Sequence, residues 1–313
     1  MNRKLRIIFM GTPDFAVPTL RIIHESSYDV VAVVTAPDKP AGRGLQLHSS
    51  PVKEYALSQN IPVLQPVKLK DPVFLEELKS FNGNIQIVVA FRMLPDVVWQ
   101  MPELGTFNLH ASLLPDYRGA APINWAVING EKETGITTFF LKHDVDTGDI
   151  IFQEKIPIEP DENAGSVHDR LMVAGAGLVL KTLKAIESDS IETFPQTVFH
   201  VSKPAPKLFK GNCRIDWKNK SLDDLHNFIR GLSPHPAAWT TLDGKVLKIY
   251  KTMKEIVVAN DTPGTIFTDQ KTFIKIAANG GYLQLLELQL EGRKRMSVEE
   301  FLRGNFVKVK IAE

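Results

Sequence analysis

Short apolar runs alternate with amphipathic stretches along the first two-thirds of the chain. The runs have the length of buried strands and cover residues 6–10, 29–35, 85–90, 106–110, 135–141 and 149–157. Apolar residues recur at helical spacing in residues 14–24, 50–59, 71–79 and 166–186. This β-α order predicts an α/β fold with a doubly wound and mostly parallel sheet, whose functional groups gather at the carboxyl ends of the strands.

The pattern changes near residue 191. Residues 191–208 contain Pro195, Pro204 and Pro206 without helical spacing, which is typical of a connector. A helix over 221–230 then precedes short apolar runs at 246–253, 265–267, 273–277, 282–290 and 306–311. Several short strands separated by glycine-containing turns predict a small C-terminal β-barrel, a fold that often binds nucleic acid. We therefore expect one domain over 1–190, a linker over 191–207 and a second domain over 208–313.

Composition limits the class of protein. The 313 residues are 43% hydrophobic and 23% charged, which excludes disordered and fibrous chains and suits about two globular domains. A single cysteine cannot form an internal disulfide, and the apolar run at 7–10 is too short for a signal-peptide core. No apolar run approaches a membrane span, so we predict a cytoplasmic protein with no membrane partner.

Charge is divided unevenly between the two parts of the chain. Residues 1–202 carry 18 Lys and Arg against 24 Asp and Glu, whereas residues 203–313 carry 19 against 12. A basic C-terminal part joined to an acidic remainder indicates a polyanion-binding domain beside a small-molecule site. Uneven surface charge without any partner explains the counts equally well, so charge alone leaves both interpretations open.

The densest group of chemically active side chains lies in residues 108–122. Asn108 and His110 fall in a predicted strand, so their side chains point to the same face. An amide donor beside an imidazole suits acyl transfer, because one group can hold an oxyanion while the other moves a proton. Asp146, which follows another predicted strand, could orient the imidazole and stabilise its charged form. The residues alone equally allow these side chains to bond local backbone and to cap turns.

Other motifs narrow the chemistry. The first βα turn, residues 9–15, holds a single glycine, with Pro13 near where a dinucleotide-binding loop needs another, so we do not expect an NAD enzyme. No two histidines lie within four residues and no Gly-x-Ser-x-Gly occurs, so neither a local metal site nor a serine nucleophile is predicted. The Pro- and Gly-rich loop that carries Lys39 and Arg43 is long enough to be either functional or disordered.

These segments resemble the folate-dependent formyltransferases, and among them the branch that formylates methionyl initiator tRNA. The shared segments extend over nearly the whole chain and are residues 11–15, 37–44, 108–122, 146–149, 214–217, 225–231 and 286–302. The signature at 108–118 together with Asp146 marks the wider family, whereas the 35–53 loop and the C-terminal domain indicate the tRNA branch. Phe91-Arg92 stands where many members carry Tyr-Gly, and His235 where an aromatic residue is common.

The resemblance implies a Rossmann-like catalytic domain over 1–190, a linker over 191–207 and a C-terminal OB-like tRNA-binding domain over 208–313. It also implies 10-formyltetrahydrofolate as the formyl donor and no tightly bound metal. The methionyl amine would attack the formyl carbon directly, and the catalytic residues would be Asn108, His110 and Asp146. Residues implied to contact the folate are Val89, Phe91, Arg92, Leu94, Ser112, Leu113, Leu114 and Pro115. Residues implied to contact the methionyl-tRNA are Phe15, Lys39 and Arg43.

Two alternatives stay open at this point. A formyltransferase for an amino-sugar nucleotide or another small amine would share the N-terminal chemistry, but it would need neither the 35–53 loop nor a basic barrel. A non-catalytic nucleic-acid-binding protein would keep the fold and would have no physical need for Asn108, His110 and Asp146 together. The leading interpretation has initiator methionyl-tRNA and the folate as partners of a monomer, since no coiled coil or apolar interface stripe is visible.

Overall fold

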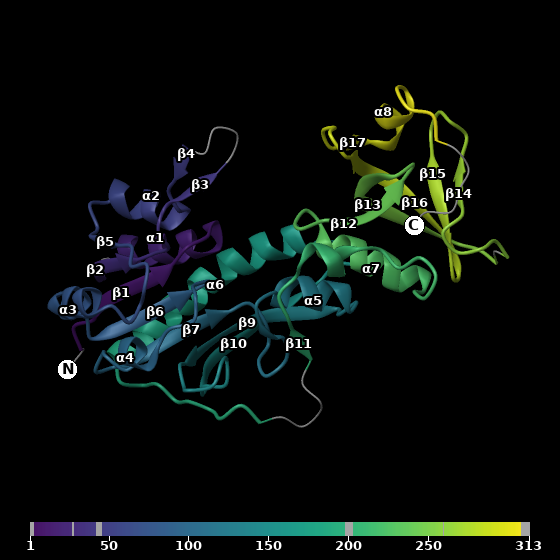
Figure 1. The fold of residues 1–313 in the computed structure, drawn as a ribbon. Helices are drawn as coiled ribbons and strands as arrows, with labels where there is room; N and C mark the ends of the chain where they lie inside the picture. The colour runs from purple at the N-terminus through teal and green to yellow at the C-terminus, as the bar shows by residue number, and fades with distance from the viewer. Residues whose placement is uncertain (1–2, 27, 42–45, 198–202, 259, 308–313) are drawn as a thin grey trace. The chain divides into compact units, whose positions relative to one another are not determined.

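The structure is a computed structural model that describes residues 3–26, 28–41, 46–197, 203–258 and 260–307 (Figure 1). The chain forms two compact units. Unit 1 comprises Met1–Gly119, Gly135–Ile156 and His168–Pro204, and unit 2 comprises Ala120–Thr134, Pro157–Val167 and Ala205–Glu313. Two internal segments of the chain therefore belong to the same unit as its C-terminal third.

Unit 1 is built on a seven-stranded sheet with the order β10-β9-β7-β6-β1-β2-β5 (Figure 1). Its strands are β1 (Arg6–Gly11), β2 (Asp29–Val34), β5 (Val63–Leu64), β6 (Ile85–Val89), β7 (Thr106–His110), β9 (Glu133–Phe140) and β10 (Ile150–Pro157). The pairs from β5 through β7 are parallel, and β9 runs antiparallel to β7. The predicted mostly parallel, doubly wound sheet is confirmed. Its order reverses between β1 and β6, where such folds hold their ligands.

Helices cover both faces of this sheet. They are α1 (Val17–Glu25), α2 (Pro51–Ser58), α3 (Pro72–Ser80), α4 (Asp96–Trp99) and α6 (Ala164–Glu187), with a 3-10 turn η1 (Asp14–Ala16). Helix α6 packs closely on β7, since a Cβ at Gly175 would come within 2.7 Å of the Leu109 side chain. The hydroxyl of Thr182 on α6 also lies 2.9 Å from that of Thr138 on β9. On the opposite face, α3 and α4 share a core with Val88 of β6.

The segment after β2 is more ordered than the pattern of residues predicts. Within the 35–53 loop, β3 (Lys39–Ala41) and β4 (Gln46–His48) form a hairpin with Lys39 opposite His48. The prolines and glycines of the surrounding loop conceal these three-residue strands. Ser50 then starts α2 by accepting a hydrogen bond from the backbone N–H of Lys53, with Pro51 as the first helical residue.

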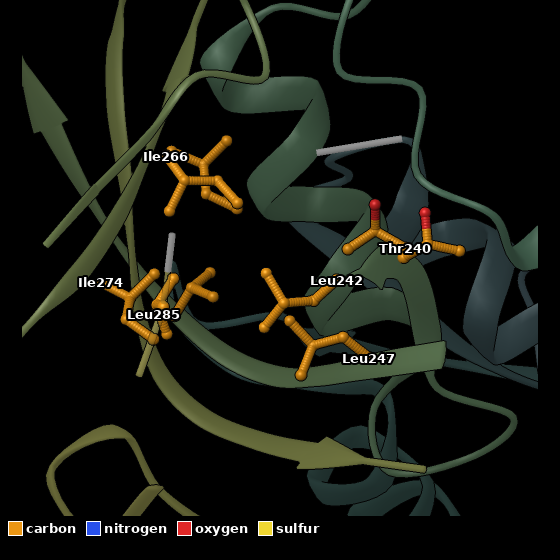
Figure 2. A pocket seen from close by; sticks show the side chains of 9 residues that line it. Thr240, Leu242, Leu247, Ile266, Ile274 and Leu285 are labelled. Carbon is orange, nitrogen blue, oxygen red and sulfur yellow. The ribbon is translucent and has the colours of Figure 1, made fainter. Parts of the chain in front are cut away.

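Unit 2 contains an antiparallel sheet curved around one apolar core. Its strand order is β12 (Ala238–Leu242), β13 (Lys245–Ile256), β16 (Gly281–Leu290), β15 (Ile274–Ala278) and β14 (Ile266–Thr268), with β17 (Met296–Ser297) paired to β16. A small cavity is lined by residues from each of the first five strands, including Leu242, Leu247, Ile266, Ile274 and Leu285 (Figure 2). Because the first and last strands in the order line one cavity, the sheet curves as a small barrel requires.

Helix α7 (Leu222–Leu232) packs against this sheet and begins with a capping box, in which Ser221 and Asp224 each accept the other's backbone N–H. The remaining elements are α5 (Pro122–Ile128), β8 (Arg118–Gly119), β11 (Pro204–Ala205), a 3-10 turn η2 (Lys210–Cys213) and α8 (Val298–Leu302). The predicted strand at 306–311 is wrong for residues 306 and 307, which lie outside any strand, and its other residues lie outside the described part of the chain.

A buried histidine lies between α7 and β13. His226 is 3% exposed, and its Nδ1 lies 3.0 Å from the hydroxyl of Thr252. Its Nε2 lies 3.3 Å from a carboxylate oxygen of Asp161. Burial lowers the pKa of this ring, and the positive charges of Lys254 and Arg230 lower it further, against the opposing effect of Asp161. The neutral ring is therefore the form that suits the folded unit.

Candidate active site

Asn108 and His110 lie at the carboxyl end of β7. Strand pairing places Asn108 beside Val88 and Val89 beside Gly11, so the ends of β7, β6 and β1 meet at one edge of the sheet. Leu109 faces α6, and therefore the side chains of Asn108 and His110 both point to the opposite face. Asn108 is half-buried and His110 is buried. An amide and an imidazole thus lie at the carboxyl end of β7, one strand away from the point between β1 and β6 where the strand order reverses.

Both ring nitrogens of His110 face oxygen atoms. Nε2 lies 2.8 Å from the backbone carbonyl oxygen of Tyr117, and because a carbonyl only accepts, Nε2 donates in this pair. Nδ1 lies 4.0 Å from Oδ2 of Asp146, which is too far for a direct hydrogen bond. A water molecule about 2.8 Å from each of these two atoms fits such a gap. When a proton reaches Nδ1, the resulting N–H group therefore faces a carboxylate.

Asp146 occupies the turn between β9 and β10, at φ +54°. Its Oδ2 accepts a hydrogen bond of 3.1 Å from the backbone N–H of Gly119. Gly148, two residues later, packs so tightly that a Cβ there would lie 1.5 Å from the carbonyl oxygen of Phe140. The turn therefore has little freedom to move, and the three residues predicted to act together, Asn108, His110 and Asp146, lie at one end of the sheet.

The predicted folate segment at Ser112–Pro115 is tied to the neighbouring strands. The buried hydroxyl of Ser112 donates to the carbonyl of Asp116 at 2.7 Å. Thr137 on β9 donates to the carbonyl of Ser112 at 2.7 Å, and Gln153 on β10 donates to that of Leu114 at 2.8 Å. Leu114 is buried, whereas Leu113 and Pro115 are half-buried. This segment therefore presents a fixed backbone beside His110. Thr137 and Gln153 were not predicted, because polar residues on strands carry no distinct signal.

The predicted pterin segment follows β6. Val89 and Leu94 are buried and Phe91 is half-buried. Arg92 donates from Nη1 to the carbonyl of Val67 at 3.0 Å and from Nη2 to that of Pro66, so its guanidinium is tied to the segment after β5. Burial lowers the pKa of Arg92. The side chain that departs from the common pattern of the family thus links two loops of unit 1.

Phe15 lies in η1, directly after the first βα turn. It is 6% exposed, and its ring centroid lies 5.1 Å from that of His168 on α6. A Cβ at Gly11 would lie 2.8 Å from the Cβ of Ala16, so a glycine is needed for η1 to approach the end of β1. This close approach gives the single glycine of the turn a packing role.

The base of the 35–53 loop is held by polar contacts. Lys53 Nζ lies 2.5 Å from a carboxylate oxygen of Asp38, and Gln65 donates to the other oxygen at 2.8 Å. The hydrogen bonds from Lys53 and Gln65 lower the pKa of Asp38. Lys39 is exposed on β3, and Arg43 lies outside the described residues.

Among the residues that the structure describes, no group of three or more His, Cys, Asp or Glu could hold a metal ion. None of the helices described is long and apolar enough to cross a membrane.

The fold and this site define a class of protein. The chain belongs to the formyl transferase family, with residues 4–183 matching the formyl transferase domain and residues 207–305 its C-terminal domain. Among its relatives is the methionyl-tRNA formyltransferase of Flavobacterium johnsoniae, which is 57% identical over 305 residues and covers 96% of each chain. The methionyl-tRNA formyltransferase of Bacteroides thetaiotaomicron is 55% identical over 309 residues, covering 96% of this chain and 95% of that protein.

Solved structures share the fold at low sequence identity. An N-formyltransferase from Helicobacter canadensis, in complex with folinic acid and dTDP-3-aminofucose, matches with a TM-score of 0.69 at 21% identity and covers 93% of this chain and 100% of its own. HypX from Aquifex aeolicus, in complex with tetrahydrofolic acid, matches with a TM-score of 0.66 at 18% identity, over 99% of this chain and 51% of its own.

Proposed function

We propose that this chain transfers the formyl group of 10-formyltetrahydrofolate to the amino group of methionyl initiator tRNA. The observation that carries the proposal is that Asn108 and His110 share the carboxyl end of β7, with Nδ1 of His110 4.0 Å from Oδ2 of Asp146. The acceptor is supported by the relatives, because those at 55% and 57% identity are named methionyl-tRNA formyltransferases and match this chain over nearly its full length.

The reaction proceeds by direct attack. The methionyl amine forms a bond to the formyl carbon, and the carbonyl oxygen takes up negative charge as the tetrahedral intermediate forms. The bond from that carbon to N10 of the folate then breaks, and the proton lost by the amine passes to N10. No covalent enzyme intermediate is needed, which agrees with a site built from an amide, an imidazole and a carboxylate.

Asn108 stabilises the oxyanion through its amide N–H. His110, whose ring nitrogens face Tyr117 and Asp146, stabilises it through the positive charge of its protonated ring, which Asp146 supports. An amide N–H aimed at a developing oxyanion commonly contributes 10²- to 10³-fold in rate, roughly 3–4 kcal/mol. Positive charge on His110 is balanced by the carboxylate whose Oδ2 lies 4.0 Å from Nδ1. A water bridging these two atoms would link the imidazole to the carboxylate by hydrogen bonds.

The folate contacts of this proposal come from the two segments that flank the site. The pterin lies against Val89, Phe91, Arg92 and Leu94, and the segment Ser112–Pro115 holds the donor from the other side. The fixed backbone of that second segment, pinned by Thr137 and Gln153, supports this role. Phe15 packs against the methionine side chain, and Lys39 and Arg43 approach the acceptor end of the tRNA.

Unit 2 supplies the tRNA-binding surface in this proposal. Its charged side chains include Lys210 and Arg214, whose cationic groups lie 5.9 and 5.8 Å from the ring centre of Trp239. Lys207 lies 5.5 Å from the ring centre of Phe209, which is 61% exposed. Cations beside accessible aromatic rings suit a polyanion with stacked bases. We assign residues 1–190 to catalysis, 191–207 to a linker and 208–313, the C-terminal part of unit 2, to tRNA binding. The segments Ala120–Thr134 and Pro157–Val167 pack in unit 2 but belong in sequence to the catalytic part. We further propose that the protein is a cytoplasmic monomer.

A single-turnover assay tests this function. Purified protein is mixed with 10-formyltetrahydrofolate and, in separate reactions, with methionyl initiator tRNA, uncharged tRNA or an amino-sugar nucleotide. Transfer confined to the charged tRNA is the expected result. Transfer to the sugar amine alone would support formyl transfer as the reaction but refute methionyl-tRNA as the acceptor. No transfer to any of the three would refute the proposal. Analytical sedimentation of the same sample tests the proposed monomeric state.

A further inference from the structure

We propose that Gln196 is a positioning residue that holds Asp146 in place for catalysis, an inference that rests on the proposed function of that carboxylate. Its amide nitrogen donates to the carbonyl of Asp146 at 2.9 Å and to that of Gly148 at 2.8 Å. Its amide oxygen accepts from Nε of Arg118 at 3.1 Å and from Nη2 at 2.5 Å. Two donated and two accepted hydrogen bonds use the full capacity of a glutamine side chain.

The backbone brings Gln196 to this position. Phe194 and Ile150 form an antiparallel bridge, with N–H to carbonyl distances of 2.8 and 2.9 Å in the two directions. This bridge fixes the segment after α6 against the start of β10. Gln196, two residues farther along, then faces the turn that ends at β10. The side chain of Phe194 is 57% exposed, so the bridge depends on its backbone.

Gln196 joins the two loops that set the position of the carboxylate. One loop carries Asp146, whose backbone is in the left-handed region at φ +54°, where a non-glycine residue needs support from its neighbours. The other carries Arg118 and Gly119, and the N–H of Gly119 donates to Oδ2 of Asp146. The amide side chain of Gln196 therefore bonds the backbone of Asp146 on one side and Arg118 on the other. Arg118 directly precedes Gly119, whose N–H donates to the Asp146 carboxylate.

The distance from Asp146 to His110 depends on this link. Nothing in the contacts of Gln196 touches His110 itself, so its effect reaches the ring through Asp146. Loss of the link frees the turn, and displacing a catalytic group by about 1 Å can cost up to 10²-fold in rate. Binding of folate and of tRNA involves other residues in the proposed function. The expected signature is thus a lower kcat with nearly unchanged KM values.

The first test combines Gln196→Ala with Asp146→Asn in single-turnover and steady-state assays with methionyl initiator tRNA. Gln196→Ala alone should lower kcat about 10- to 100-fold and leave both KM values within about twofold. In the Asp146→Asn background the same change should cost less than about twofold, because the group it positions is already lost. An unchanged kcat, or an equal loss in both backgrounds, would overturn the positioning role.

Two further variants separate positioning from folding. Gln196→Glu keeps the size of the side chain and its bonds from Arg118 but removes both donors, so it should reproduce the loss of kcat. Gln270→Ala is the matched control. The side-chain amide of Gln270 donates to the carbonyl of Val307 and accepts from its N–H, and both residues lie outside unit 1. It should leave kcat unchanged. Wild-type kcat in a folded Gln196→Glu variant would overturn the proposal.

Hydrogen exchange gives a readout that does not depend on activity. The Gly119 amide should exchange at least about tenfold faster in Gln196→Ala than in the wild type, because its acceptor on Asp146 is no longer held. Amides of β7 should keep their protection. Unchanged exchange at Gly119 would refute the positioning role of Gln196, whatever the activity of the protein. Failure of the wild-type protein to formylate tRNA would refute the proposed function, and the exchange result would still test the positioning role.

Discussion

Replacing Gly148 with alanine should displace Asp146 and slow formyl transfer. A Cβ at this position would lie 1.5 Å from the carbonyl oxygen of Phe140, where ordinary contact begins at 3.4 Å. Both atoms belong to backbone or are fixed to it, so no side-chain rotation relieves the overlap. The turn must therefore move by about 1.9 Å, the difference between those two distances. Asp146 lies two residues away in the same turn, so the forced displacement reaches it.

The electrostatic cost follows from the distance between Asp146 and His110. A shift of about 1.9 Å away from the ring lengthens the Nδ1 to Oδ2 distance from 4.0 Å to about 5.9 Å. At an effective dielectric constant of about 20, the attraction between carboxylate and imidazolium falls from about 4.2 to about 2.8 kcal/mol. The difference of about 1.4 kcal/mol corresponds to about a tenfold loss of rate.

Single-turnover kinetics and thermal unfolding of Gly148→Ala check this estimate. The rate should fall about tenfold or more, with a melting temperature lower by a few degrees because overpacking costs about 1–3 kcal/mol. Gly177→Ala is the control, since a Cβ on this exposed residue of α6 meets nothing within 4 Å. It should stabilise the helix by about 0.5–1 kcal/mol at an unchanged rate. A Gly148→Ala protein with wild-type rate and melting temperature would refute the steric reasoning.

Three other changes test separate parts of the molecule. Asp146→Ala should lower the single-turnover rate by about 10²-fold with tRNA affinity nearly unchanged in filter binding, and an unaltered rate would remove it from the mechanism. Replacing Lys210 and Arg214 with alanine should weaken tRNA binding and reduce the slope of log K against log salt by about 1 per residue, whereas an unmoved slope would argue against phosphate contacts. The pKa of His226 is lowered in the folded unit, so the unfolded chain takes up a proton at this residue first and stability should decline as pH falls below about 6.5. The melting temperature of His226→Gln should therefore fall less steeply than that of the wild type between about pH 6.5 and 5. An equally steep fall would exclude His226 as the cause.

The sheet of unit 1 could be predicted because its strands are buried on both faces. The run predicted over 85–90 is apolar and contains β6. The segment predicted over 106–110 alternates polar residues with Phe107 and Leu109, and it coincides with β7. Strand β5 has two residues and β12 alternates buried with half-buried positions over only five, so neither produces a clear signal. The predicted strand at 306–311 had apolar content like that of β14, but residues 306 and 307 follow α8 outside any strand.

The sequence predicts which side chains form the candidate site, but it does not predict the backbone groups that hold them. Asn108 and His110 were found through the two-residue period of a strand, and Asp146 through a polar turn after another strand. Their support comes instead from backbone groups, namely the carbonyl of Tyr117 and the N–H of Gly119. Every residue except proline carries such a donor and acceptor, so nothing in the sequence distinguishes these two.

The support of Asp146 also leaves its negative charge available to His110. Among the residues that the structure describes, its carboxylate bonds a neutral backbone N–H and faces one ionisable group within 4.0 Å, the imidazole. Gln196 holds the turn through neutral amide donors, while the charge of Arg118 lies on the far side of that amide. A lysine in place of Gln196 would put a cation beside the carboxylate and offset part of the attraction that stabilises a protonated His110. A neutral amide fixes the geometry and preserves the electrostatic coupling on which the proposed proton transfer depends.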